Sequence, residues 1–383
     1  MAEIRLNRSR SALADPEEAA EALVNGLEGG EPKLVTLFAA RERDQRAINQ
    51  AVRRRLPKGT RLIGATTSGE VDNDGVHSGS VVLGALSGDF EVGLGLGRDL
   101  SIDAMGAGSA ATKAACEELG TRPQNLDPRR YVGAIIDDGL RVKKEELLLG
   151  ALDRNQSLVV VGGGAADPAW QSAEIHFDGE VVTDAALLAL FRTDAPWATF
   201  RAHPYHPTGK VFTITEVDDT GTRAVTIDGE PAAPRFSALT GVPVEELDFF
   251  APNGFAVHSA ALRVGREYFM RGPFKVYPDQ SIEFVNLLAE GATLEIMKLG
   301  DLVEMTRDFF TKEIPRAVPD PRAALFFNCG ARSWIAQARG IVEPLSETFA
   351  AAPPCVGFNV HFEIFCGFQI NSTLTSLVFG ADT

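Results

Sequence analysis

The feature that most constrains how this chain can fold is a repeat within its own sequence. When Phe38 is aligned with Phe327, each phenylalanine belongs to an apolar run, and an arginine follows five residues later, at Arg43 in the first copy and Arg332 in the second. Apolar runs that end in a small-residue turn are typical of buried strands. A repeat of this kind has to be recognised before a fold is assigned, because it sets the unit from which the fold is built.

A second apolar run in each copy carries a glycine and, six residues later, a glutamate. These are Gly64 and Glu70 in the first copy and Gly357 and Glu363 in the second. A turn region and a further strand-like run follow each glutamate. The pattern therefore predicts a strand-helix-strand-strand unit that occurs twice, with a weaker third copy over residues 131–164.

The predicted elements indicate an α/β fold with two mixed-sheet domains and flanking helices, related by the internal repeat. Helices are expected, among other places, over residues 44–56, 103–119 and 301–314. Residues 192–210 contain three prolines and no periodic signal, which favours a boundary there. We predict an N-terminal helical extension at 1–30, a first domain at 31–195, a linker at 196–210 and a second domain at 211–383.

Composition excludes several classes of partner. The net charge is −15, with 52 acidic against 37 basic residues, so we expect no nucleic-acid partner. No apolar stretch approaches the roughly 20 residues of a membrane-spanning helix, and the first residues do not resemble a signal peptide. We expect a cytoplasmic protein without a membrane partner. The four cysteines form no CxxC pair, so neither a disulfide framework nor a zinc site is predicted.

The arginine and glutamate of each copy are candidate ligand-binding residues. Arg332 and Glu363 are expected near adjacent strand ends, where ligands bind in sheets of this kind. A guanidinium can hold a carboxylate through two hydrogen bonds, and a glutamate can accept from an ammonium group, so the pair suits an amino acid. Arg43 and Glu70 repeat the arrangement. The alternative is a structural ion pair that serves only the fold.

Cys329 is the candidate nucleophile. It precedes a predicted helix, whose N-terminus can activate a thiol, and this leaves a hydrolase as one possible function. The apolar residues before it favour the alternative, an inert buried thiol. The sequence contains no GxSxG motif, and we expect no catalytic residue in this chain.

Several of these segments resemble the signatures of the FIST family, which has paired N-terminal and C-terminal domains. The resemblance rests on Gly64-Ala65-Thr66-Thr67-Ser68-Gly69-Glu70, Asn328-Cys329-Gly330-Ala331-Arg332, the strand from Gly357 to Glu363, and Asn371-Ser372-Thr373. It covers the chain from about Leu34 to Gly380. One departure is His361-Phe362-Glu363, where a glycine is expected before the glutamate. The resemblance implies a free-standing sensory protein that binds a small ligand and acts on a signalling partner such as a histidine kinase or a cyclase.

We therefore expect a ligand site in the C-terminal copy, with an equivalent site in the first copy. The candidate ligand-binding residues are Arg332, Glu363, Cys329, Asn328, Gly357 and Asn359, and in the first copy Arg43, Glu70 and Thr67.

Heme is an alternative ligand. Some free-standing FIST proteins are heme-dependent nitric oxide sensors that act on a histidine kinase, and the resemblance extends that role to this chain. His361 lies in a strand-like apolar run, where a neutral imidazole can ligate heme iron. His258 and His176 are rival ligands, and a histidine satisfied within the core is the alternative for each.

Overall fold

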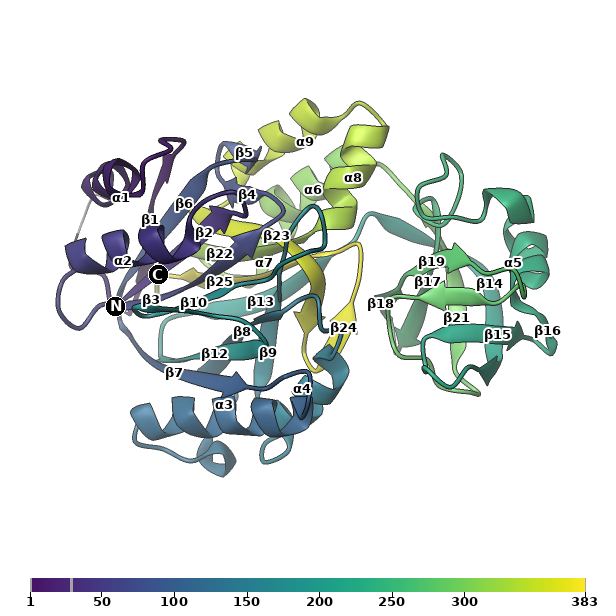
Figure 1. Ribbon diagram of the computed structural model, residues 1–383, viewed down its shortest axis with the longest axis horizontal. Coiled ribbons are helices and arrows are strands. Elements are labelled where there is room, and N and C mark those ends of the chain that lie inside the picture. Colours follow the sequence, from purple (N-terminus) through teal and green to yellow (C-terminus); the bar gives the residue numbers. More distant parts are fainter. Residues whose placement is uncertain (1, 28–29, 383) are drawn as a thin grey trace.

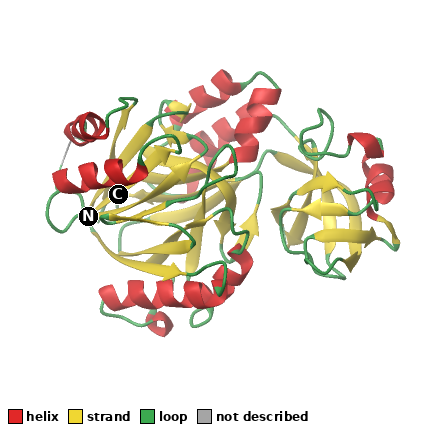
Figure 2. Ribbon diagram, in the orientation of Figure 1, coloured by secondary structure: helices red, strands yellow, loops and turns green. Residues whose placement is uncertain are grey.

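The computed structural model describes residues 2–27 and 30–382 and has a large body and a smaller lobe (Figure 1). The body contains the strands of residues 4–202 together with those of residues 321–380, and the strands of residues 205–299 form the lobe. The lobe is rich in strands, whereas most helices cover the body (Figure 2). The predicted α/β class with mixed sheets is confirmed.

Two sheets form the body. In order across the sheet, the six strands of the first are β1 (Ile4–Ser11), β6 (Val81–Gly88), β2 (Leu34–Ala40), β3 (Arg61–Thr67), β10 (Ile175–Phe177) and β11 (Glu180–Val182). The second follows the order β13 (Trp197–Ala202), β25 (Leu374–Gly380), β22 (Pro321–Cys329), β23 (Cys355–Phe365), β9 (Val159–Ala165), β8 (Tyr131–Asp138), β12 (Ala185–Thr193) and β7 (Phe90–Arg98). The short strands β4 (Glu70–Asp72), β5 (Gly75–His77) and β24 (Phe368–Ile370) extend the second sheet.

The lobe is a separate sheet with its own apolar core. Its strands are β18 (Glu267–Arg271), β17 (His258–Val264), β21 (Thr293–Leu299), β14 (Tyr205–Val217), β15 (Arg223–Ile227), β20 (Ile282–Phe284) and β19 (Pro273–Val276), with β16 (Glu230–Pro231) beside β15. Helix α5 (Ala232–Thr240) packs on this sheet through Phe236, which contacts the rings of Phe212 and Phe255.

Helices cover the outer faces of the two body sheets, so the body has four layers (Figure 1). They are α1 (Pro16–Asn25) and α2 (Gln45–Arg55) on the first sheet, α3 (Ala104–Glu118) and α4 (Lys144–Leu152) on the second, and α6 (Leu302–Asp308), α7 (Ile314–Ala317), α8 (Gly330–Ala338) and α9 (Val342–Thr348) beside β22 and β23. Single helical turns lie at Pro123–Asn125, Val244–Glu246 and Phe349–Ala351, and Phe309–Glu313 is a π-helical segment.

The helices expected over residues 44–56, 103–119 and 301–314 begin at the predicted positions, each behind an aspartate. The side chains of Asp44, Asp103 and Asp301 accept hydrogen bonds from backbone N–H groups in the first turn of their helices, and these N–H groups would otherwise have no partner.

The core lies between the two sheets, where Phe38 of the first sheet stacks on Phe358 of the second with ring centroids 4.6 Å apart.

The predicted repeat is confirmed, and the weaker third copy is a full one. In each copy the first two strands are parallel and the last strand pairs antiparallel with the first. The three sets are β2, β3 and β6; β22, β23 and β25; and β8, β9 and β12. The sequence alignment also gives the correct register, because Gly64 lies opposite Leu37 and Gly357 lies opposite Phe326.

A glycine makes the same close contact in all three copies. A Cβ atom added to Gly64, Gly162 or Gly357 would lie 1.8, 1.9 or 2.0 Å from the carbonyl oxygen of Leu37, Ile135 or Phe326, respectively. Real Cβ atoms do not approach backbone oxygen so closely, so only glycine permits this strand pairing.

The predicted linker at 196–210 is wrong, because these residues form β13 and the start of β14. Pro207 lies in β14 at a register shift against β21, a place where a strand tolerates proline. The predicted second domain at 211–383 divides at about residue 300, since β22, β23 and β25 return to the body. The predicted extension at 1–30 contains strand β1 as well as helix α1, and residues 1, 28 and 29 lie outside the described part.

Among residues 2–27 and 30–382, no helix combines the length and the apolar character that crossing a membrane requires.

The close glycine contact gives a test of the repeat. Gly357→Ala should lower the free energy of unfolding by about 3 kcal/mol or more, because its methyl group must displace backbone that lies 2.0 Å away. Gly179→Ala is the control, since an added Cβ there has no heavy atom within 4 Å, and it should change stability by less than about 0.5 kcal/mol. Urea unfolding followed by circular dichroism measures both, and equal stability of the two variants would contradict the proposed contact.

Candidate functional site

A cavity of about 310 Å³ lies between the body and the lobe. The lobe contributes Phe249, Phe250 and Phe274, and the body contributes Trp334 of α8 and Trp170. The ring centroids of Phe249 and Phe250 lie 5.2 and 5.1 Å from the ring centroid of Trp334. Aromatic side chains of the lobe and the body therefore contact each other at the cavity. This size and lining are typical of a small-molecule site.

Three residues of the cavity wall have a backbone conformation that side chains disfavour. Trp170, Phe362 and Ser372 have φ angles of 56°, 62° and 51°. Phe362 occupies the bulge between His361 and Glu363, where β23 loses register with β9. Non-glycine residues at positive φ are uncommon, and they cluster at binding and catalytic sites.

Helix α8 begins at this cavity. Gly330 and Ala331, its first two residues, line the wall, and Cys329 before them provides no side-chain cap. The first N–H groups of a helix have no partner within the helix and carry a partial positive charge. The start of α8 is therefore suited to a carboxylate or another anion.

Arg332 is held inside the protein by a chain of hydrogen bonds that ends at the cavity. Its Nε donates to Asn328 Oδ1 at 2.8 Å, and its Nη2 donates to Thr306 Oγ1 at 2.8 Å. Asn328 Nδ2 donates to Asn359 Oδ1 at 2.7 Å, and Asn359 Nδ2 donates to Ser333 Oγ at 2.9 Å. Burial lowers the pKa of Arg332 to about 10. Asn359 and Ser333 line the cavity, whereas Arg332 and Asn328 lie behind it.

Glu363 is fully buried beside Cys329. Its Oε1 accepts a hydrogen bond from the Thr373 N–H at 3.3 Å, and Oε2 has no partner among the described residues. Burial raises the pKa of Glu363 to about 8, against the lowering effect of the adjacent Cys329 thiol. Burial and the nearby Glu363 also raise the pKa of Cys329 well above its usual range.

Arg332 and Glu363, expected to hold a ligand together, do not line this cavity. Two of the N–H groups of the Arg332 guanidinium are instead directed at Asn328 and Thr306 behind the wall. Of the predicted residues in this copy, Cys329 and Asn359 line the cavity, and Gly357 supports the strand pairing.

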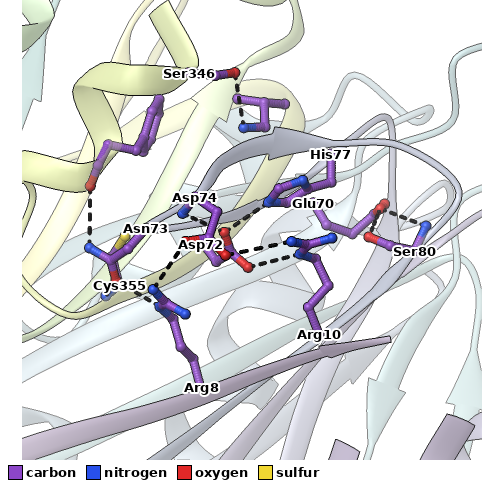
Figure 3. Close-up of polar contacts among 12 residues, drawn as sticks. Arg8, Arg10, Glu70, Asp72, Asn73, Asp74, His77, Ser80, Ser346 and Cys355 are labelled. Carbon is purple, nitrogen blue, oxygen red and sulfur yellow. Dashed lines mark hydrogen bonds and ion pairs between the residues drawn. The ribbon is translucent and has the colours of Figure 1, made fainter. Parts of the chain in front are cut away.

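In the first copy, Glu70 serves the fold. Its Oε2 accepts from the Ser80 N–H at 3.0 Å and from Ser80 Oγ at 2.6 Å (Figure 3). The Thr67 hydroxyl donates to Oε1. Arg43 Nε donates to the Gly79 carbonyl at 3.1 Å. Arg43, Glu70 and Thr67 do not line the cavity between body and lobe, so the described contacts give this trio a structural role.

The turn that follows Glu70 is anchored to the C-terminal copy. Asn73 Oδ1 accepts from the Cys355 N–H at 2.9 Å, and Asp72 accepts from His77 at 2.8 Å and from Arg10 at 3.2 Å (Figure 3). Strand β4 also pairs antiparallel with β23. The turn after Glu70 is therefore part of the second sheet and is not a free loop.

Of the three candidate histidines, only His361 lines the cavity. Its ring stacks on Trp170 with centroids 3.9 Å apart, Nδ1 has no partner among the described residues, and burial lowers its pKa to about 4. His176 lies between Asn49 and Gln45 in the core, and burial lowers its pKa to about 3. His258 lies on β17 of the lobe, away from the cavity wall.

Sequence reasoning missed the aromatic wall. The adjacent Phe249 and Phe250, and Trp334 two residues after Arg332, are visible in the sequence, but no periodic pattern marks them as a group. The two parts of this wall come together only through the packing of lobe against body.

The FIST N domain matches residues 33–230 and the FIST C domain matches residues 232–366. The chain belongs to the FIST family. FIST domains are small-ligand sensory domains of signal transduction. The two matched regions meet at residues 230–232, inside the lobe between β16 and α5, so the lobe contains parts of both FIST domains.

Other comparisons add little. No curated protein matches the chain. A crystal structure of cyanuric acid hydrolase from A. caulinodans has 11% identity and a TM-score of 0.36, with 99% of this chain and 100% of that chain covered. PurLQS from Thermotoga maritima has 10% identity and a TM-score of 0.20, with 100% and 74% covered. Structural similarity at these TM-scores supports no conclusion about the fold or the function of this FIST protein.

The buried carboxyl of Glu363 predicts an unusual pH dependence of stability. Between pH 4.5, its ordinary pKa, and about pH 8, the folded protein keeps this proton while the unfolded chain loses it. The contribution of Glu363 to stability therefore falls as the pH rises through this window. Glu363→Gln cannot ionise, so its melting temperature should fall less between pH 5 and pH 8, by about 1 °C for each kcal/mol recovered in a chain of this length.

Thermal unfolding at both pH values measures the effect. Glu245→Gln, at an exposed glutamate of the lobe, is the control and should follow the wild-type pH profile. A Glu363→Gln profile parallel to the wild type would show that Glu363 is ionised in the folded protein.

Proposed function

We propose that the cavity between body and lobe binds a small carboxylate ligand with an apolar part, an amino acid being the class that fits best, and that its occupancy is passed to a signalling partner. The observation that carries this proposal is the meeting, in one cavity, of the uncapped start of α8 with aromatic side chains from a separate lobe. A histidine kinase or a cyclase is the expected kind of partner for this member of the FIST family.

Each part of the ligand has a matching part of the wall. The carboxylate would accept from the first N–H groups of α8, at Gly330 and Ala331, where the helix dipole favours negative charge. An apolar side chain would lie against Phe249, Phe250 and Trp334. The hydroxyl groups of Ser68, Ser333 and Ser372 also line the cavity and can accept from an ammonium group.

Arg332 influences the cavity indirectly, because it does not line the wall. Its charge lies behind the cavity, and its hydrogen bonds fix Asn328 and, through it, the amide of Asn359 at the wall. Because the guanidinium is buried, its field is less screened than that of a surface arginine. It would therefore favour an anion at the start of α8 without touching it.

The join between lobe and body offers a route for the signal. Arg271 of the lobe pairs with Glu145 of α4 at 2.7 Å, and the Gly272 N–H donates to Asn371 Oδ1 at 3.2 Å, with Asn371 itself in the cavity wall. Asn286 of the lobe donates to the Gln369 carbonyl at 3.2 Å. A ligand that touches both parts would shift their relative position by its difference in affinity for the two arrangements, and a partner protein could read that shift.

The proposed ligand class is tested by calorimetry of the purified protein against the common amino acids. At least one should bind, and its decarboxylated amine should bind about 10- to 100-fold more weakly, because it lacks the group that pairs with α8. Phe250→Ala should weaken binding by about tenfold or more through the loss of aromatic contact. Val211→Ala is the control, since Val211 is a similarly exposed lobe residue outside the cavity wall.

Two results would contradict the proposal. One is the absence of heat with every amino acid. The other is an amine that binds as tightly as its parent amino acid, which would remove the role of α8.

Heme is the second candidate ligand, favoured by the neutral imidazole of His361 in the cavity wall. The fit is poorer, because Trp170 stacks on that ring and a cavity of about 310 Å³ is at the small end of ligand sites. We therefore expect hemin added to the protein to give no Soret band that depends on His361. A band that shifts with nitric oxide and is lost in His361→Ala would favour the heme sensor instead.

A further inference from the structure

Two polar side chains of the cavity wall each keep a hydrogen-bonding atom without a partner. His361 and Asn371 line the cavity with only 5% and 3% of their surfaces exposed. His361 Nδ1 and Asn371 Nδ2 have no hydrogen-bond partner among the described residues. Buried polar atoms are nearly always paired in folded proteins, so two unmatched atoms in one cavity wall indicate a polar group that the ligand supplies.

Strand pairing brings these two side chains together. Strand β24 pairs antiparallel with β23, with Ile370 opposite Glu363. Asn371 directly follows Ile370, and His361 lies two residues before Glu363. The bulge at Phe362 interrupts the alternation of β23, so both side chains reach the same cavity. Residues placed in this way have Cβ atoms roughly 5 to 7 Å apart, which allows two side chains to reach one atom between them.

The two unmatched atoms are complementary in kind. Asn371 Oδ1 accepts from the Gly272 N–H at 3.2 Å, so the free end of the amide is the donor Nδ2. Burial lowers the pKa of His361 to about 4, and the imidazole is therefore neutral at pH 7. A hydrogen bond between the ring and the Asp167 backbone acts on this pKa in the opposite direction. Since Nδ1 makes no bond, that contact assigns the proton to Nε2 and leaves Nδ1 as an acceptor.

The imidazole is held in place before a ligand arrives. Its ring stacks on Trp170 with centroids 3.9 Å apart and an angle of 19° between the planes. A Cβ atom added to Gly139 would lie 2.8 Å from His361 Cβ, so the turn after β8 also packs against this residue. A recognition group that is already ordered loses little conformational entropy on binding.

We propose that the ligand of this cavity carries a phenol, whose hydroxyl group donates to His361 Nδ1 and accepts from Asn371 Nδ2, and that tyrosine is the amino acid that fits. This inference rests on the proposed amino-acid function of the cavity and narrows its ligand class.

Other amino acids match the wall less well. A hydroxyl group is both a donor and an acceptor, so a single oxygen serves both wall atoms. The indole of tryptophan only donates and would leave Asn371 Nδ2 unpaired, and phenylalanine would leave both atoms unpaired. The amide of glutamine can serve both atoms, but it has no ring to lie against Phe249, Phe250 and Trp334. A cavity of about 310 Å³ also favours a ligand with one ring.

Calorimetry of the full chain with L-tyrosine and L-phenylalanine tests the assignment. Tyrosine should bind about a hundredfold more tightly than phenylalanine, because only tyrosine supplies a partner for both buried atoms. Tyrosine that does not bind, or that binds no more tightly than phenylalanine, would overturn the inference.

Two variants separate the contributions of the wall atoms. His361→Phe keeps a ring that can stack on Trp170 but removes the acceptor, and Asn371→Leu removes the donor at similar volume. In each variant the preference for tyrosine should fall to about tenfold or less. Phenylalanine binding in the same sample shows that the cavity is intact. His258→Phe is the matched control, because His258 lies outside the cavity wall, and it should keep the full preference. An unchanged preference in His361→Phe or in Asn371→Leu would overturn the inference.

Nitrogen NMR of ¹⁵N-labelled protein observes the hydrogen bond itself. Tyrosine should shift the unprotonated ring nitrogen of His361 upfield, phenylalanine should not, and the signal is assigned by its loss in His361→Phe. A signal that does not move when tyrosine is bound would contradict the proposed contact.

The phenol assignment and the proposed function fail in different ways. Binding of phenylalanine or tryptophan at least as tightly as tyrosine would remove the phenol assignment and leave the amino-acid proposal standing. Absence of heat with every amino acid is the result that removes the proposed function itself.

Discussion

The close approach of two parallel strands at a glycine is the contact on which the rest of this structure depends. Gly64, Gly162 and Gly357 each allow the second strand of a copy to lie against a carbonyl of the first, with no room for a Cβ atom. This contact fixes the register of each strand pair and with it the faces to which the following residues point. Three copies pack into two sheets, and the stacking of Phe38 on Phe358 joins the first copy to the last.

The same unit then serves two different purposes. In the first copy, Ser80 and Thr67 satisfy both oxygens of Glu70. The turn beyond it is held to Cys355 of the second sheet through Asn73 (Figure 3). In the last copy, a bulge at Phe362 disturbs the pairing with β9, and one oxygen of Glu363 has no hydrogen-bond partner in the part of the chain that the structure describes. Departure from the repeat therefore coincides with the cavity, as expected where local regularity is given up for function.

The lobe completes the site that the body begins. The body supplies the start of α8 and the buried polar chain of Arg332, Asn328 and Asn359, whereas the lobe supplies the apolar wall. Neither part encloses a ligand by itself, and the polar join around Arg271 is of the kind that allows two parts to move. This division agrees with the proposal that ligand occupancy shifts the lobe relative to the body.

The sequence by itself determined the repeat, its register, the α/β class and the family, because glycine spacing and apolar periodicity are local properties of the chain. Cys329 and Asn359, two of the residues that it singled out, line the candidate cavity. Only the tertiary structure decided that Arg332 and Glu363 lie behind the cavity, that residues 205–299 form a lobe, and that Phe249 and Phe250 meet Trp334. The reason is that these contacts join residues far apart in the sequence and depend on how the elements pack. Such contacts produce no periodic pattern in the sequence.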